Sequence, residues 1–128
     1  MISREQTYAK NAYEHISKLA KDYLDENAAE RKEYGGMALK LPVLVRQAGL
    51  VQALAFVESR GKDSQKGLLD DLAATVGEND KNQLLDRSRE ADLEEYMALT
   101  EKTLLALKWY KRFAQSILKV KPTDETEE

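Results

Sequence analysis

The chain has 128 residues and a formal net charge of −3, and 34% of its residues are charged, with both signs interspersed. This length predicts one domain with a single core over residues 1–121, and the mixed charge excludes a bulk polycation. The absence of cysteine excludes disulfides, thiolate nucleophiles, zinc knuckles and iron–sulfur ligation.

A first helix is predicted from Ser3 to about Glu26. Ser3 and Gln6 have the spacing of a capping box, in which each side chain satisfies a backbone amide at the helix start. The apolar face recurs at spacings of three and four residues. It consists of Ala9, Ala12, Ile16, Leu19, Ala20 and Tyr23, and Tyr13 and Leu24 widen it.

Residues 27–36 form either a loop or the charged first turns of a second helix. The apolar spacing of Met37, Leu41 and Leu44 continues across Gly35-Gly36, although each glycine costs about 1 kcal/mol relative to alanine in a helix. We therefore favour a helix with a weak point at the two glycines.

The run from Lys40 to Phe56 is the longest weakly charged stretch of the chain, with Lys40 and Arg46 as its only ionisable groups. Apolar residues at helical spacing lie on both sides of Gly49, which predicts a hairpin of two helices that meet there. Glycine suits the left-handed conformation just past a helix end. Pro42 marks either the first turn of a helix or a kink in one.

Three further boundaries follow the hairpin. The third helix is expected to end near Gly61, and Asp63 or Ser64 is expected to cap a fourth helix that ends at Gly77. Asn79 or Asp80 is expected to cap a short fifth helix, whose apolar residues are Leu84 and Leu85.

The last helix is predicted from Asp92 to about Val120, with acids in its first turn, where the helix dipole favours negative charge. Its apolar stripe is Leu93, Met97, Thr100, Leu104, Leu107, Ala114 and Leu118. Pro122 is expected to stop it, and residues 122–128 to form a disordered acidic tail. No segment shows the alternation of a strand. The predicted fold is an all-α, compact bundle of five or six helices, with long N- and C-terminal helices around the central hairpin.

No set of residues indicates catalysis, a metal or a cofactor. His15, the single imidazole, lies beside the apolar face of the first helix and is interpreted as a boundary residue, since metal sites need several convergent donors. Ala12, three residues earlier, excludes the Glu-x-x-His spacing of di-iron bundles. Asp70-Asp71 is the most tempting pair for magnesium, but adjacent helical residues point about 100° apart. We interpret the pair as the solvated edge of an amphipathic helix.

A basic group without any acid closes the last helix. It consists of Lys108, Lys111, Arg112, Lys119 and Lys121. Cations near a helix C-terminus complement its dipole, but five over four turns exceed what the last turn explains, so phosphate binding is an equal alternative. Weaker candidates are Arg4, Lys10, Lys18, Lys40 and Arg46. The tyrosines at 8, 13, 23 and 34, with Trp109 and Tyr110, are capable of stacking on bases, but helical spacing is more typical of core positions.

Several short patterns occur in a characteristic order over residues 3–118. They are Arg4-x-Gln6-x-x-Ala9, Tyr34 followed by Lys40-Leu41-Pro42, Gly49-Leu50 with Ala53-Leu54-Ala55-Phe56, and Tyr96 with Leu107-Lys108-Trp109-Tyr110-Lys111-Arg112-Phe113. In their order, spacing and total length, they resemble the small helical subunit of the type III-B CRISPR (Cmr) effector complex. Residues 62–90 and the tail do not contribute.

This resemblance implies a non-catalytic subunit of a guide-RNA-directed interference complex. Such subunits stack in several copies beside the backbone subunits, along the channel that holds the guide RNA–target RNA duplex, and target cleavage belongs to the backbone subunits. The implied partners are the other Cmr subunits, further copies of the chain and the duplex.

The resemblance carries over no strict signature of functional residues, so the site residues are predicted from charge. We expect Lys108, Lys111 and Arg112 to contact target-strand phosphates, with Arg4, Lys40 and Arg46 as further candidates. Two alternatives stay open: a helical adaptor without nucleic-acid contact, and an enzyme with carboxylate-bound magnesium. No apolar run approaches the roughly 20 residues that cross a bilayer, and the N-terminus has no signal core. We therefore expect a cytoplasmic protein.

Overall fold

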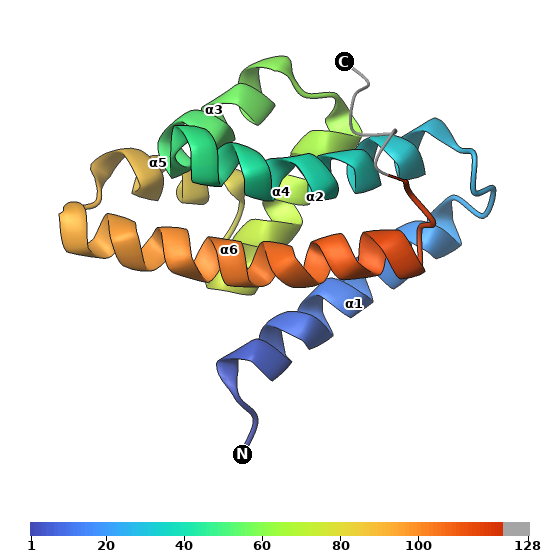
Figure 1. Ribbon diagram of the computed structural model, residues 1–128, viewed down its shortest axis with the longest axis horizontal. Coiled ribbons are helices and arrows are strands. Elements are labelled where there is room, and N and C mark those ends of the chain that lie inside the picture. Colours follow the sequence, from blue (N-terminus) through green and yellow to red (C-terminus); the bar gives the residue numbers. More distant parts are fainter. Residues whose placement is uncertain (122–128) are drawn as a thin grey trace.

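The computed structural model describes residues 1–121, which form six α-helices and no strand (Figure 1). The helices are α1 (Arg4–Asp22), α2 (Ala29–Ala48), α3 (Leu50–Arg60), α4 (Asp63–Val76), α5 (Lys81–Glu90) and α6 (Leu93–Ser116). This architecture confirms the all-α prediction and the expected number of helices. The acidic tail predicted at 122–128 lies outside the described residues.

The capping box at the start of α1 is confirmed. The Gln6 backbone amide donates to the Ser3 hydroxyl at 3.1 Å, and the Ser3 amide donates to the Gln6 side chain at 2.9 Å. The helix ends at Asp22, so the predicted end at Glu26 is wrong by four residues. The Asp25 carboxylate accepts from the amide of Asn27 at 2.9 Å and thereby stabilises a turn in place of another helical turn.

The central hairpin is also confirmed. Helix α2 runs without a break through Gly35-Gly36, and Pro42 lies in its interior and not in its first turn. Gly49 joins α2 to α3 with φ +92° and ψ 158°. The positive φ was expected, but ψ is extended and lies outside the left-handed helical well, in a region that glycine almost alone adopts.

The cap predicted for α4 is wrong. Lys62 occupies the cap position, and the backbone amide of Lys62 donates to the Gln65 side chain at 2.9 Å. Ser64 instead donates its hydroxyl to the Glu33 carboxylate of α2 at 2.7 Å. The end of α4 at Gly77 is confirmed, with φ +99° and ψ 15° in the left-handed helical region.

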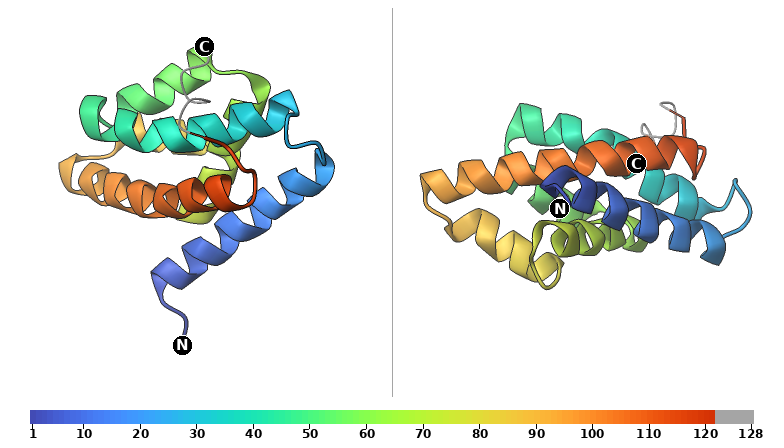
Figure 2. Two further views of the ribbon diagram at one scale, coloured as in Figure 1. Left: turned by 45° about the vertical axis from the view of Figure 1, so that its right-hand side comes forward. Right: turned by 90° about the horizontal axis from the view of Figure 1, so that it is seen from below.

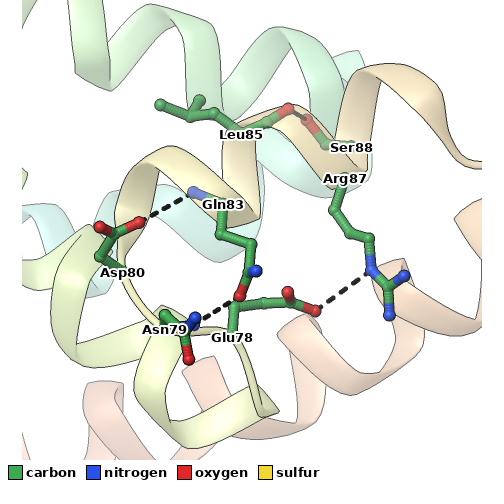
Figure 3. Close-up of polar contacts among 7 residues, drawn as sticks. All are labelled: Glu78, Asn79, Asp80, Gln83, Leu85, Arg87 and Ser88. Atoms are coloured by element: carbon green, nitrogen blue, oxygen red, sulfur yellow. Dashed lines mark hydrogen bonds and ion pairs between the residues drawn. The ribbon is translucent and has the colours of Figure 1, made fainter.

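The turn between α4 and α5 is held by polar contacts (Figure 3). Asp80 caps α5 as predicted and accepts the Gln83 amide at 3.0 Å. The Asn79 amide donates to the Gln83 side chain at 2.7 Å, and Glu78 accepts from Arg87 Nε at 3.3 Å. These contacts explain how a short helix with little apolar surface keeps a defined start.

Helix α4 lies at the centre of the bundle and packs against each of the other five helices. The terminal helices α1 and α6 lie side by side (Figure 2), and α6 also packs against α2. The prediction that both terminal helices surround the hairpin is therefore wrong for α1, which packs mainly on α6 and α4. The largest fully buried side chains are Ile16, Leu41, Leu50, Leu54, Val57, Leu68, Leu69, Leu72, Leu84, Leu107, Tyr110 and Leu118.

The buried face of α6 differs from the predicted stripe at its start. Leu93 and Met97 are 72% and 55% exposed. The buried residues are Leu99, Thr103, Ala106, Leu107, Tyr110 and Ala114. In these first turns Tyr96 packs against the core instead, and its hydroxyl accepts the backbone amide of Val51 in α3 at 3.1 Å.

The predicted end of α6 at Val120 is wrong by four residues. After Ser116 the chain turns back over α2, with Lys119 at φ +63°. The buried Arg31 guanidinium donates to the carbonyl of Ile117 at 3.1 Å and to that of Tyr23 at 3.0 Å, so it joins the ends of α6 and α1. Val120 then packs against Gly35. We call residues 117–121 the C-terminal strap.

Candidate nucleic-acid interface

A groove lies between α2 and α6 and has a volume of about 710 Å³. It is lined by Pro42 and Arg46 from α2 and by Glu101, Leu104, Leu105, Lys108, Lys111, Arg112 and Gln115 from α6. Four cations therefore face one carboxylate. The structure brings together Lys108, Lys111 and Arg112, the three residues that the sequence favoured, with Arg46 from the opposite helix.

Helical periodicity explains how these residues reach one groove. On α6, Leu104, Lys108 and Lys111 follow one another at spacings of four and three, and Leu105 and Arg112 lie two turns apart, so their side chains share one face. Pro42 and Arg46 are one turn apart on α2. Because α2 ends at Ala48, Arg46 lies in its last turn, facing α6.

The cations of the groove differ in their partners. Lys108 Nζ lies 2.5 Å from the Glu5 carboxylate, which also accepts the indole N–H of Trp109 at 3.2 Å. The hydrogen bond from Lys108 lowers the pKa of Glu5. Arg46, Lys111 and Arg112 have no hydrogen-bond or ion-pair partner within residues 1–121. Three of the four positive charges are thus available to an anion.

The remaining predicted residues lie elsewhere. Arg4 lines a neighbouring hollow with Ala98 and Lys102, and this hollow shares Glu101 and Leu105 with the groove. Lys40 is apart from both, since its ammonium group lies 5.3 Å from the centroid of the Phe56 ring on α3. The sequence analysis missed Lys102, because it lies beside Glu101 and outside the acid-free stretch.

The aromatic residues are mostly part of the core. Tyr8, Tyr34 and Tyr110 are buried, as the spacing predicted, whereas Tyr13 and Tyr23 are exposed. Tyr13 contacts the Phe113 ring edge-on, with 5.6 Å between the centroids. None of these rings lines the groove, so the groove has no aromatic stacking platform.

The interpretation of Asp70-Asp71 as a solvated edge is wrong for Asp71. Asp71 is half-buried and accepts the Tyr34 hydroxyl at 2.6 Å, and burial raises its pKa. Asp70 is exposed and accepts the backbone amide of Lys81 at 2.8 Å. Within residues 1–121, no group of three or more His, Cys, Asp or Glu side chains is arranged to hold a metal ion.

His15 is half-buried, which confirms its boundary position. Its Nδ1 lies 2.6 Å from the Tyr110 hydroxyl, which also contacts the Thr75 hydroxyl at 2.8 Å and donates to the Asp71 carbonyl at 3.1 Å. Through Asp71 the network reaches Tyr34. It therefore connects α1, α2, α4 and α6 inside the bundle and explains why a phenol is tolerated at the fully buried position 110.

The fold and the groove define a small helical protein with a basic surface groove between two of its helices. In residues 1–121, every helix is too short or too polar to cross a membrane. The chain belongs to the family of CRISPR-associated proteins described as Cas_Cmr5, whose sequence model matches residues 4–117. The resemblance stated above is thereby confirmed.

A curated relative and a solved structure agree with this assignment. The CRISPR system Cmr subunit Cmr5 of Thermus thermophilus is 50% identical over 118 residues, which cover 92% of this chain and 98% of the relative. The X-ray crystal structure of a CRISPR-associated Cmr5 family protein, also from Thermus thermophilus, is 49% identical. Its TM-score is 0.82, and the match covers 91% of this chain and 98% of the crystallised one.

Proposed function

We propose that the chain is the non-catalytic small subunit of a type III-B CRISPR Cmr effector complex, present in several copies along the channel that holds the guide RNA–target RNA duplex. The support is the half-identical relative, which is named as a Cmr subunit and matches over nearly its whole length. The partners are then the other Cmr subunits, further copies of the chain and the duplex, and the expected compartment is the cytoplasm.

In this proposal Lys111 and Arg112, together with Lys108 and Arg46, contact phosphates of the target strand. The observation that carries it is the groove, where three cations without an internal partner face a single carboxylate. Phosphate contacts supply affinity without sequence preference. That is the contribution needed from a subunit in a complex whose sequence specificity comes from guide–target pairing.

The test is charge reversal in the assembled complex. The variant Lys111→Glu/Arg112→Glu should weaken capture of target RNA, most strongly at low salt. It should also reduce the slope of log affinity against log salt by about 1.4 or more, since each lost contact to a single strand contributes about 0.7. The control is Lys32→Glu/Arg60→Glu, which changes two exposed cations outside the groove. Equal capture by both variants across the salt series would remove the groove from the proposal.

A second candidate function is a helical adaptor that binds protein alone. It is favoured by the exposed apolar side chains of Leu93 and Met97, one turn apart at the start of α6, and by Leu24 at 82% exposure. These positions also suit contacts between copies of the chain. Purification of the assembled complex distinguishes the functions, since an adaptor brings partner subunits without repeat-derived guide RNA.

A further inference from the structure

We infer that the groove between α2 and α6 is a subsite for an unpaired nucleotide of RNA, with the base on its apolar floor and the flanking phosphates on its cationic rim. The inference deepens the proposed function and rests on it, because it adds a base contact to the phosphate contacts at the same site. The class of ligand inferred for the groove is thus an unpaired nucleotide of RNA and not a phosphate backbone alone.

The floor of the groove is apolar. It is formed mainly by Leu104 and Leu105 of α6, which are half-buried, so that part of each side chain faces the groove; the buried Pro42 of α2 lies beside them. A site that bound only the phosphates of a paired strand would leave this floor in contact with water, because the bases of a duplex are stacked inside the helix. A base that leaves the stack would cover the floor and remove apolar surface from water.

The rim supplies cations from both sides of the floor. Arg46 stands on α2, and Lys111 and Arg112 stand on α6, all three without a partner within residues 1–121. Phosphates on either side of a nucleotide would therefore meet a positive charge. The guanidinium groups of Arg46 and Arg112 also suit a nucleotide because they bind phosphate with two parallel hydrogen bonds and stack flat on rings.

The dimensions and the charge agree with this ligand. Sites for small ligands have volumes of roughly 300–1,000 Å³, and the groove has about 710 Å³. Four cations against the single carboxylate of Glu101 favour a polyanion.

The experiment uses the full-length chain and three fluorescently labelled RNA probes of equal length, followed by anisotropy at fixed salt. The probes are a single strand, the same strand with abasic central positions, and a blunt duplex. The intact single strand should bind more tightly than the abasic strand by roughly fivefold, the effect of losing a modest apolar contact. It should also bind more tightly than the duplex.

A variant separates the floor from the rim. Leu105→Asn should lower affinity for the intact strand to that of the abasic strand and leave abasic binding unchanged, whereas Lys111→Glu/Arg112→Glu should weaken both. Helical content and unfolding midpoint establish that each variant folds. The comparison of probes on the unaltered chain requires no substitution and stands if Leu105→Asn does not fold.

Two results would overturn the inference. Equal affinity for the intact and abasic strands would show that the groove binds phosphates alone, and the proposed function would stand. If no RNA probe bound and a labelled acidic peptide bound instead, the groove would be assigned to a protein partner. If in addition the charge-reversed complex captured target RNA normally, the phosphate contacts proposed for the groove would fall as well.

Discussion

Substitution of Gly35 by alanine should destabilise the protein, although alanine is the better helix former by about 1 kcal/mol. A Cβ at position 35 would overlap Val120 Cγ1 and lie 3.1 Å from Cγ2, whereas carbon atoms in contact prefer about 3.5–4.0 Å. Val120 would have to move away and take the C-terminal strap with it. Overpacking of this kind costs about 1–3 kcal/mol, so after the gain in helix propensity we expect a net loss of up to about 2 kcal/mol in the free energy of unfolding.

The assay is urea unfolding followed by circular dichroism, with Gly67→Ala as the matched control. Gly67 is also in a helix interior, but an added Cβ there meets no atom within 4 Å, so this variant should gain up to about 1 kcal/mol. The same substitution should thus have opposite signs at the two positions. A Gly35→Ala protein as stable as the Gly67→Ala protein would refute the packing argument. Replacing Val120 by alanine in the Gly35→Ala background should make the substitution at position 35 less costly.

Four other substitutions give defined outcomes. Tyr110→Phe should cost about 1–3 kcal/mol in the free energy of unfolding, since it leaves buried partners unsatisfied. Tyr8→Phe, at a buried tyrosine whose hydroxyl has no hydrogen-bond partner within residues 1–121, should cost less than about 0.5 kcal/mol. Burial raises the pKa of Asp71, so the native state binds its proton more tightly than the unfolded state. The free energy of unfolding of the unaltered protein, relative to that of Asp71→Asn, should therefore fall as the pH rises from 3.8, the ordinary pKa of an Asp carboxyl, through the raised pKa. A difference between the two free energies of unfolding that does not change with pH would contradict this. Glu5→Gln should free Lys108 and tighten RNA binding at low salt, and the fluorescence of Trp109, the single tryptophan, should report the change.

Most of the fold could be predicted from local signals. The ends of α2 and α4 and the start of α5 followed from Gly49, Gly77 and Asp80, because caps and positive-φ glycines act over a few neighbouring residues. The ends of α1 and α6 were each placed four residues too late. The local turn at Asp25 ends α1. Arg31 donates to the carbonyls of Tyr23 and Ile117, and its contact with Ile117 comes from 86 residues away, so it leaves no pattern near the end of α6.

The groove could be predicted in part. The acid-free stretch of α6 identified Lys108, Lys111 and Arg112, since one helix face is readable from spacing. The position of Arg46 opposite them follows from the packing of α2 on α6, and Lys40, only six residues earlier, points to α3 instead. The half-buried state of Asp71 likewise depends on Tyr34, 37 residues away in sequence. Contacts of this range are set by the tertiary fold and not by local propensity.

The pairing of the first helix with the last has a consequence for synthesis. His15 and Tyr110 are 95 residues apart in sequence, and the groups of α2 that receive Ile117 and Val120 leave the ribosome long before those residues do. The surfaces of α1 and α2 that pack on α6 stay uncovered until nearly the whole chain has been translated, and contacts of such long range form late in folding. A chain that terminates early lacks both α6 and its strap, and it is left as a substrate for proteases. The α6-facing surfaces of α1 and α2 are therefore buried only once α6 and its strap are complete.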